Sequence, residues 1–194
     1  MLLDIILKLN WVDILFVTVL LRTCFVSFKT GFTVESFKLL GILFSIYVSC
    51  HYYTALSDVI QKYFPTEKFP LEFLDFLVFL LLVIIADAFF ILLRSVFYHF
   101  MKLQAVPALN KWGGLVLGLV RAYFLIGLIV FMLIISTLDY LRNSALNSYL
   151  GRRFYKVAPN TYTWVWNSIT SKFMANEKFN NTITEVQVDA GIVK

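Results

Sequence analysis

Residues 71–98, LEFLDFLVFLLLVIIADAFFILLRSVFY, decide the fold class of this chain. Their central run, FLVFLLLVIIA at 76–86, contains no charged or polar side chain. At a rise of 1.5 Å per residue, a helix over this stretch would extend about 42 Å, which is enough to cross a hydrocarbon layer of roughly 30 Å with some tilt. The stretch therefore predicts a transmembrane helix.

The composition of the whole chain agrees with this prediction. Of its 194 residues, 60% are hydrophobic and only 15% are charged, and the mean hydropathy is +0.79. In a soluble globular domain about 25% of residues are charged. The chain is too apolar for a water-soluble fold, and several membrane spans would leave no room for a sizeable soluble enzyme domain.

Three further apolar runs accompany the first. Together they predict four spans, at about 9–28, 34–55, 71–98 and 113–138. The turn SFKTG at 27–31 is so short that we expect the first two spans to form an antiparallel helical hairpin. Four spans place both chain termini on the same side of the membrane.

The predicted fold class is thus an all-α membrane protein, with a four-helix transmembrane domain over residues 1–140. In residues 141–175 polar and apolar side chains alternate at helical spacing, which predicts amphipathic helices in the plane of the lipid headgroups. Docking of these helices against partner helices is the alternative. The apolar stripe of the second such helix comprises Tyr162, Val165, Trp166, Ile169 and Phe173. Residues 176–194 show no sustained periodicity, and we expect a mobile polar tail there.

The charges indicate a membrane surface as the partner. The net charge is +5, but Lys and Arg are spread along the chain and do not gather on one face, so anionic lipid is a better partner than nucleic acid. A small excess of Lys and Arg at one set of helix ends favours both termini in the cytoplasm. Cys24 and Cys50 lie within apolar runs without the spacing of a metal site, and we expect neither a metal nor a cofactor.

Small residues recur at four-residue spacing in two of the spans. Ser27 precedes Gly31, and Gly114 precedes Gly118 in a GxxxG pattern. In lipid, such a stripe lets two helix backbones approach closely. The stripes therefore predict helix packing, either within the bundle or between two copies of the chain.

Charged residues inside the spans predict an intramembrane polar network, because each costs a few kcal/mol at the bilayer centre unless it faces protein or water. The predicted members are Asp13, Arg22, Glu35, Asp87, Arg94 and Arg121. We expect Asp87 to pair with Arg22 and Glu35 with Arg121. The network could hold the helices together or line a path for a proton or substrate.

Catalysis is not expected. Asp75 and Asp87 lie about 18 Å apart along one helix, too far to share a proton as an aspartyl dyad. Cys50 and His51 are sequence neighbours and point in different directions on a helix, with no third group to orient them. HExxH, GxSxG, P-loop and GxGxxG patterns are all absent from the sequence.

Three blocks of sequence resemble the colicin V production protein (CvpA) family. They are WVDILFVTVLLRTCFVSFKTGFTVESFKLLGIL at 11–43, LNKWGGLVLGLVRAYFL at 109–125 and NSALNSYLGRRFYKVAP at 143–159. Ser27 stands where the family commonly has glycine, so a sharply strained turn is not expected there. The family positions that the blocks match are Asp13, Gly31, Glu35, Gly41, Gly114, Gly118 and Arg121.

The resemblance implies a multi-pass protein of the bacterial inner membrane with a role in bacteriocin production or export. We expect a non-catalytic accessory protein that acts as a homo-oligomer or beside a membrane-transport partner. The alternative is a transporter or channel subunit in which Arg22, Asp87 and Arg121 line a polar path. The two hypotheses differ in whether the charged groups are paired and dry or exposed to water.

Overall fold

The computed structural model describes residues 10–63, 70–100, 107–174 and 176–189, and these residues form an all-helical structure. Four of the helices are long and apolar enough to cross a membrane, which confirms the predicted fold class. These four are α2 (Trp11–Thr30), α3 (Phe32–Tyr63), α4 (Leu71–Phe100) and α5 (Pro107–Ile134). The shorter helices that follow are α6 (Asp139–Asn147), α7 (Gly151–Phe154), α8 (Val157–Val165), the π-helix η1 (Trp166–Thr170), α9 (Ser171–Phe173) and α10 (Thr182–Asp189).

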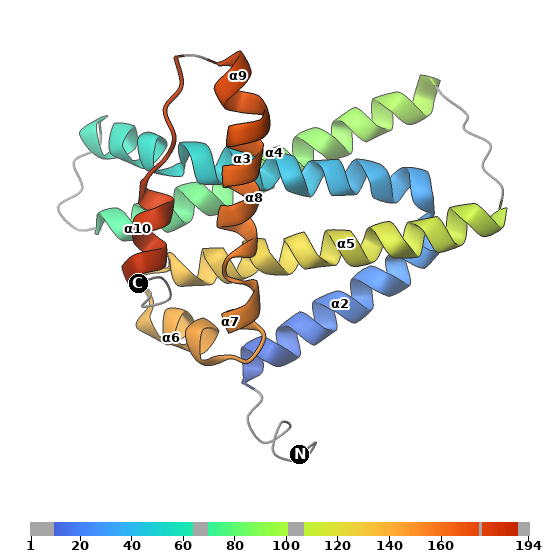
Figure 1. Ribbon diagram of the computed structural model, residues 1–194, viewed down its shortest axis with the longest axis horizontal. Coiled ribbons are helices and arrows are strands. Elements are labelled where there is room, and N and C mark those ends of the chain that lie inside the picture. Colours follow the sequence, from blue (N-terminus) through green and yellow to red (C-terminus); the bar gives the residue numbers. More distant parts are fainter. Residues whose placement is uncertain (1–9, 64–69, 101–106, 175, 190–194) are drawn as a thin grey trace.

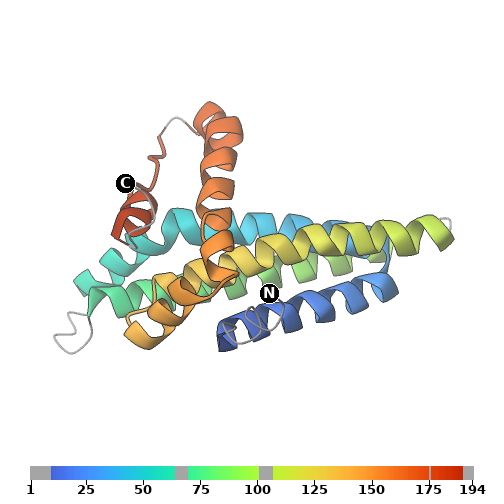
Figure 2. The same ribbon diagram turned by 60° about the horizontal axis from the view of Figure 1, so that its bottom comes forward.

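The turn between α2 and α3 differs from the expected hairpin. Gly31 alone separates the two helices, and its φ of +82° is a conformation that glycine adopts without steric cost. Helices that pack side by side have axes 8–10 Å apart, and a one-residue connection cannot span that gap along their length. The helices instead diverge from Gly31 as an open V, and α2 packs mainly against α5 (Figures 1 and 2).

Helix α3 lies at the centre of the bundle and packs along both α4 and α5. It continues past the predicted end of the second span at 55, because one face of its last turns packs against other parts of the chain while the opposite face is exposed. Ile60 packs against the main apolar core, and the hydroxyl of buried Ser57 donates a hydrogen bond to Asp75 of α4. The ring of Tyr53 meets Phe79 edge to face in the same region.

The helices after α5 cross the bundle. The column of α8, η1 and α9 runs across α3 and α5 at a steep angle in Figure 1 and stands out from the bundle in Figure 2. Ala158 and Tyr162 of α8 are fully buried, whereas Trp164 is 62% and Phe173 82% exposed. One face of the column thus docks on the chain's own helices, and an aromatic face remains free.

The C-terminal segment also differs from the expectation. Within residues 176–194, where the sequence predicts a polar tail, Thr182–Asp189 form helix α10. Ile183 is 1% exposed in the main core, and Val186 packs against it. Two apolar anchors in a short helix are enough to attach it to a preformed surface, but they are too few to create a sustained sequence period.

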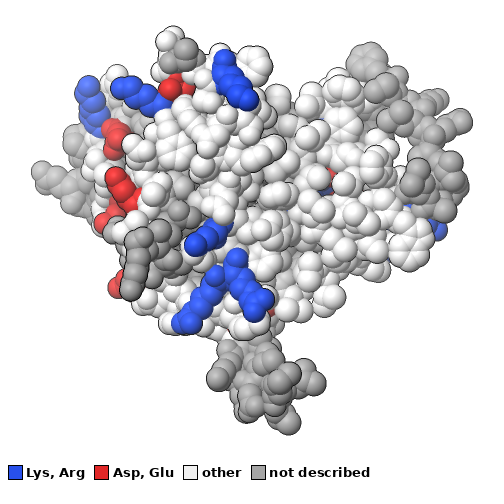
Figure 3. Space-filling model, viewed as in Figure 1, with Lys and Arg blue, Asp and Glu red and all other residues white. Residues whose placement is uncertain are grey.

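Charged side chains are distributed unevenly over the surface. On the face shown in Figure 3, Lys, Arg, Asp and Glu gather over the half of the molecule that carries α6 to α10, and the other half is almost uncharged. From Phe32 to His51, where α8 docks through Tyr162, α3 rises about 28 Å. This is close to the hydrocarbon thickness of a bilayer, so the Gly31 turn and α8 lie one membrane thickness apart.

Candidate functional site

The small residues singled out in the sequence form a seam between α2 and α5. Gly114 lies against the backbone of Gly31 and the carbonyl oxygen of Ser27, and Gly118 lies against the Ser27 side chain. A methyl group at either glycine would collide with α2. The seam is therefore formed within one chain, and the GxxxG pattern is already occupied by helix packing.

Two residues position α3 against its neighbours, Asn110 at its start and Gly41 further along. The side-chain oxygen of Asn110 accepts a hydrogen bond from the backbone N–H of Phe32 at 2.8 Å, satisfying one of the free donors of the helix N-terminus. Gly41, further along α3, lies against the side chain of Phe90 and permits α4 to approach. Asn110 was not among the predicted site residues, because nothing in the local sequence shows that its side chain reaches a distant helix.

Glu35 is the centre of the intramembrane polar network. Its side chain is 0% exposed although the residue lies in the first turn of α3. The Thr30 hydroxyl donates to Oε1 at 2.6 Å, and the Lys38 ammonium lies 2.7 Å from the same oxygen. On the other side, Arg121 Nε lies 3.3 Å from Oε2 as an ion pair without an aligned hydrogen bond. The structure thus brings Glu35 and Arg121 together, as the sequence predicted.

The second predicted pair does not form. Arg22 lies exposed on α2 and Asp87 lies exposed on α4, and within the described residues no ion pair joins them. Asp87 is instead close enough to interact electrostatically with Arg121, as is Arg94. The reason for the difference is the open V at Gly31, which directs α2 onto α5 and away from α4.

Asp13 connects the first helix to the C-terminal half of the chain. It is fully buried and accepts hydrogen bonds from the backbone N–H groups of Asn10, Tyr149 and Leu150, the last at 2.8 Å. The Asn10 side chain in turn donates to the carbonyl of Ser144 at 3.0 Å. Asp13 therefore serves both as part of a capping box for α2 and as the anchor for the connection between α6 and α7.

A buried cluster around His51 was missed by the sequence analysis. The ring of His51 stacks on Tyr47 and Trp166, and its Nδ1 lies 2.9 Å from the Tyr162 hydroxyl. Its Nε2 lies 3.1 Å from a carboxylate oxygen of Glu177. This contact with the carboxylate places the proton of a neutral ring on Nε2, so the Tyr162 hydroxyl donates to Nδ1. Apart from Tyr47, these partners come from segments more than 100 positions away, and no local pattern predicts them.

The Tyr162 hydroxyl is held by a second contact. It accepts a hydrogen bond from the backbone N–H of Asn180 at 3.0 Å, and the Asn180 side chain donates to the carbonyl of Cys50 at 2.8 Å. Burial raises the pKa of Tyr162 to about 12, so the hydroxyl stays protonated and available as a donor at neutral pH. The cluster fastens α8 and the segment before α10 onto α3.

The polar groups described above bear on metal binding and on thiol reactivity. Among the described residues, no group of three or more His, Cys, Asp or Glu side chains is placed to hold a metal ion. The Cys50 thiol is fully buried and lies beside the side chain of Ser49. The groups that meet form ion pairs, helix caps and hydrogen bonds, and several of them join two elements, as Glu35 and Arg121 join α3 and α5.

These features define the class of the protein: an all-helical, multi-pass membrane protein with an intramembrane ion pair and a C-terminal helical cover. The chain belongs to the Colicin V production protein family, whose family model matches residues 12–178. The match extends over all four long helices and the α8 column, and confirms the resemblance found in the sequence. A search of curated proteins and a search of solved structures found no match.

Proposed function

We propose that this chain is a non-catalytic scaffold of the bacterial inner membrane that supports the production or export of a colicin V-type toxin. Membership of the family supports the biological setting. The observation that carries the scaffold role is Glu35, which is 0% exposed and has Thr30, Lys38 and Arg121 as partners. A conducting group must face water, whereas a group that links helices is paired and dry. Glu35 is arranged in the second way.

Arg22 supports action beside another membrane protein. It lies near the middle of α2 and is exposed on the outside of the bundle. A charge at that depth costs a few kcal/mol when it faces lipid. A second copy of the chain or a membrane-transport partner against α2 would cover it, in keeping with the accessory role.

The position of the basic residues supports cytoplasmic termini. Four of them lie on or beside α6 and α7, at the end of the bundle that carries the C-terminal helices: Arg142, Arg152, Arg153 and Lys156. Lys and Arg within 15–20 residues of a span favour the cytoplasmic side. A reporter fused after Lys194 should therefore be active as a cytoplasmic fusion and inactive as a periplasmic one.

Complementation tests the scaffold role. In a bacterium that secretes a colicin V-type toxin and lacks its own family member, expression of this chain should restore toxin activity in the medium. Glu35→Gln should fail to restore it, while Asp58→Asn, which removes an exposed carboxylate, should restore it fully. Normal secretion without any family member, or full activity of the Glu35→Gln variant, would contradict the proposal.

Asp87 favours a second candidate function, a transporter or channel subunit. It is exposed in the middle of α4, within electrostatic range of Arg121. Purified protein in liposomes should show no proton or ion flux under a pH or salt gradient if the chain is a scaffold. A flux that Asp87→Asn abolishes and Asp58→Asn leaves intact would decide for conduction.

A further inference from the structure

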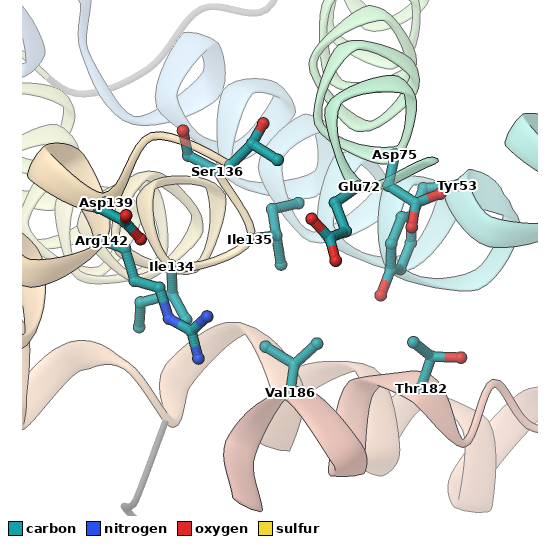
Figure 4. Close-up of a pocket in the computed structure, with 11 residues that line it drawn as sticks. Tyr53, Glu72, Asp75, Ile134, Ile135, Ser136, Asp139, Arg142, Thr182 and Val186 are labelled. Atoms are coloured by element: carbon teal, nitrogen blue, oxygen red, sulfur yellow. The ribbon is translucent and has the colours of Figure 1, made fainter. Parts of the chain in front are cut away.

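A cavity of about 270 Å³ lies between the ends of the long helices and α10. Its walls come from α3, α4, the end of α5, the start of α6 and the inner side of α10 (Figure 4). Ile134, the last residue of the fourth candidate span, and Glu72, in the first turn of α4, both line it. The cavity thus lies at the boundary of the apolar bundle, at the height of lipid headgroups.

The charged side chains of this cavity lie at two ends. Figure 4 shows Glu72 and Asp75 beside Tyr53 at one end and the guanidinium group of Arg142 at the other, with Asp139 on the same side as Arg142. Asp75 accepts a hydrogen bond from the Ser57 hydroxyl. Among the described residues neither Glu72 nor Arg142 makes an ion pair. Both of these charges are therefore available to a ligand.

Tyr53 gives independent evidence that the cavity takes a polar ligand. Its side chain is 1% exposed, and its hydroxyl has no hydrogen-bond partner in the part of the chain that the structure describes. Figure 4 shows this hydroxyl directed into the space in front of Thr182. Buried hydroxyl groups are almost always hydrogen-bonded, because an unpaired one costs free energy. A ligand nitrogen at the Glu72 and Asp75 end would supply the missing partner.

We propose that this cavity binds a small zwitterionic group, an ammonium next to a phosphate or carboxylate. The ammonium donates hydrogen bonds to Glu72, Asp75 and the Tyr53 oxygen, which are all acceptors in that arrangement. The anionic part lies toward Arg142, whose guanidinium group suits phosphate and carboxylate. Two sources supply this chemistry: the headgroup of phosphatidylethanolamine in the bilayer, or a free molecule of the same kind.

Calorimetry on the purified full-length chain in detergent tests the free source, with O-phosphoethanolamine as the probe. Phosphocholine is the matched control, because its quaternary ammonium has no N–H to donate. We expect saturable binding of phosphoethanolamine and at least about tenfold weaker binding of phosphocholine, the effect of losing charge-assisted hydrogen bonds. Native mass spectrometry from nanodiscs of mixed phosphatidylethanolamine and phosphatidylcholine tests the lipid source, where preferential retention of phosphatidylethanolamine is expected.

Three variants locate the binding. Glu72→Gln and Arg142→Gln should each weaken it about tenfold, and Tyr53→Phe several-fold. Asp87→Asn should leave it unchanged, because Asp87 is an exposed carboxylate of the same helix that lies outside the cavity, about 18 Å along α4 from Asp75. Glu72 is exposed, so its substitution tests the site even if Tyr53→Phe disturbs the core. Binding of either source that follows this pattern supports the proposal. The absence of selective binding from both sources, or binding that Glu72→Gln and Arg142→Gln leave intact, would overturn it.

Discussion

Gly114 of α5 lies directly against the backbone of Gly31, the single residue between α2 and α3. A Cβ atom on Gly114 would lie 2.8 Å from the carbonyl carbon of Gly31 and 2.8 Å from the carbonyl oxygen of Ser27. Both contacts involve backbone, which cannot rotate away as a side chain can. The V-shaped junction of the first two helices therefore depends on a glycine in a third helix, more than 80 positions away.

Gly114→Ala should consequently lower the free energy of unfolding by about 1–3 kcal/mol, the usual cost of overpacking a close contact. Ala88→Leu is the control, since it adds more volume on an exposed position of α4 and should change stability little. Unfolding by SDS in mixed micelles measures both variants. Equal stability of Gly114→Ala and the unmodified chain would show that α2 and α5 do not approach this closely.

The Glu35–Arg121 pair should behave as a coupled unit. Arg121→Met alone leaves the buried Glu35 carboxylate without this counter-charge, and Glu35→Gln alone leaves the Arg121 guanidinium without its carboxylate. Each single change should lower the free energy of unfolding by about 3 kcal/mol. The double variant should cost less than the two single changes added together, as measured by a double-mutant cycle in mixed micelles. Arg22→Gln combined with Asp58→Asn, exposed on two different helices, is the control and should be additive. Additivity of the Glu35 and Arg121 changes would contradict the pairing.

Asp13→Ala should loosen the link between α2 and the connection from α6 to α7. The lost carboxylate caps α2 and accepts the backbone N–H groups of Tyr149 and Leu150. Loss of a helix cap costs about 1–2 kcal/mol. Hydrogen exchange should be faster at the amides of Tyr149 and Leu150 in this variant, and unchanged there in Asp58→Ala. Unaltered exchange at both amides would refute the anchoring role of Asp13.

Tyr162 should make the fold sensitive to high pH. Burial raises its pKa to about 12 from the usual value near 10, so the folded state favours the protonated form. The stabilisation is complete below pH of about 10 and is lost as the pH rises toward about 12. Stability measured across this interval should fall less in Tyr162→Phe than in the unmodified chain. The same alkaline loss in both proteins would assign the effect to other tyrosines.

The four long helices could be predicted because hydropathy is a local property that the chain carries along its length. The Glu35–Arg121 contact could be predicted because both residues lie in apolar helices where a charge needs a partner. The prediction that Arg22 pairs with Asp87 was wrong, because two residues at the same depth in the membrane need not lie on helices that face each other. Which helices face each other depends on the crossing angle set at Gly31 and on the seam with Gly114.

Other features belong to the tertiary structure alone. The contact of His51 with Tyr162 and Glu177, and the docking of α10 through Ile183, join segments far apart in the sequence. No periodicity records such contacts, because each involves one or two side chains that meet only after the bundle has formed. The sequence by itself determined a four-span helical membrane protein with buried charges. Only the tertiary structure decided which helices and charges meet, because that depends on packing geometry between distant segments.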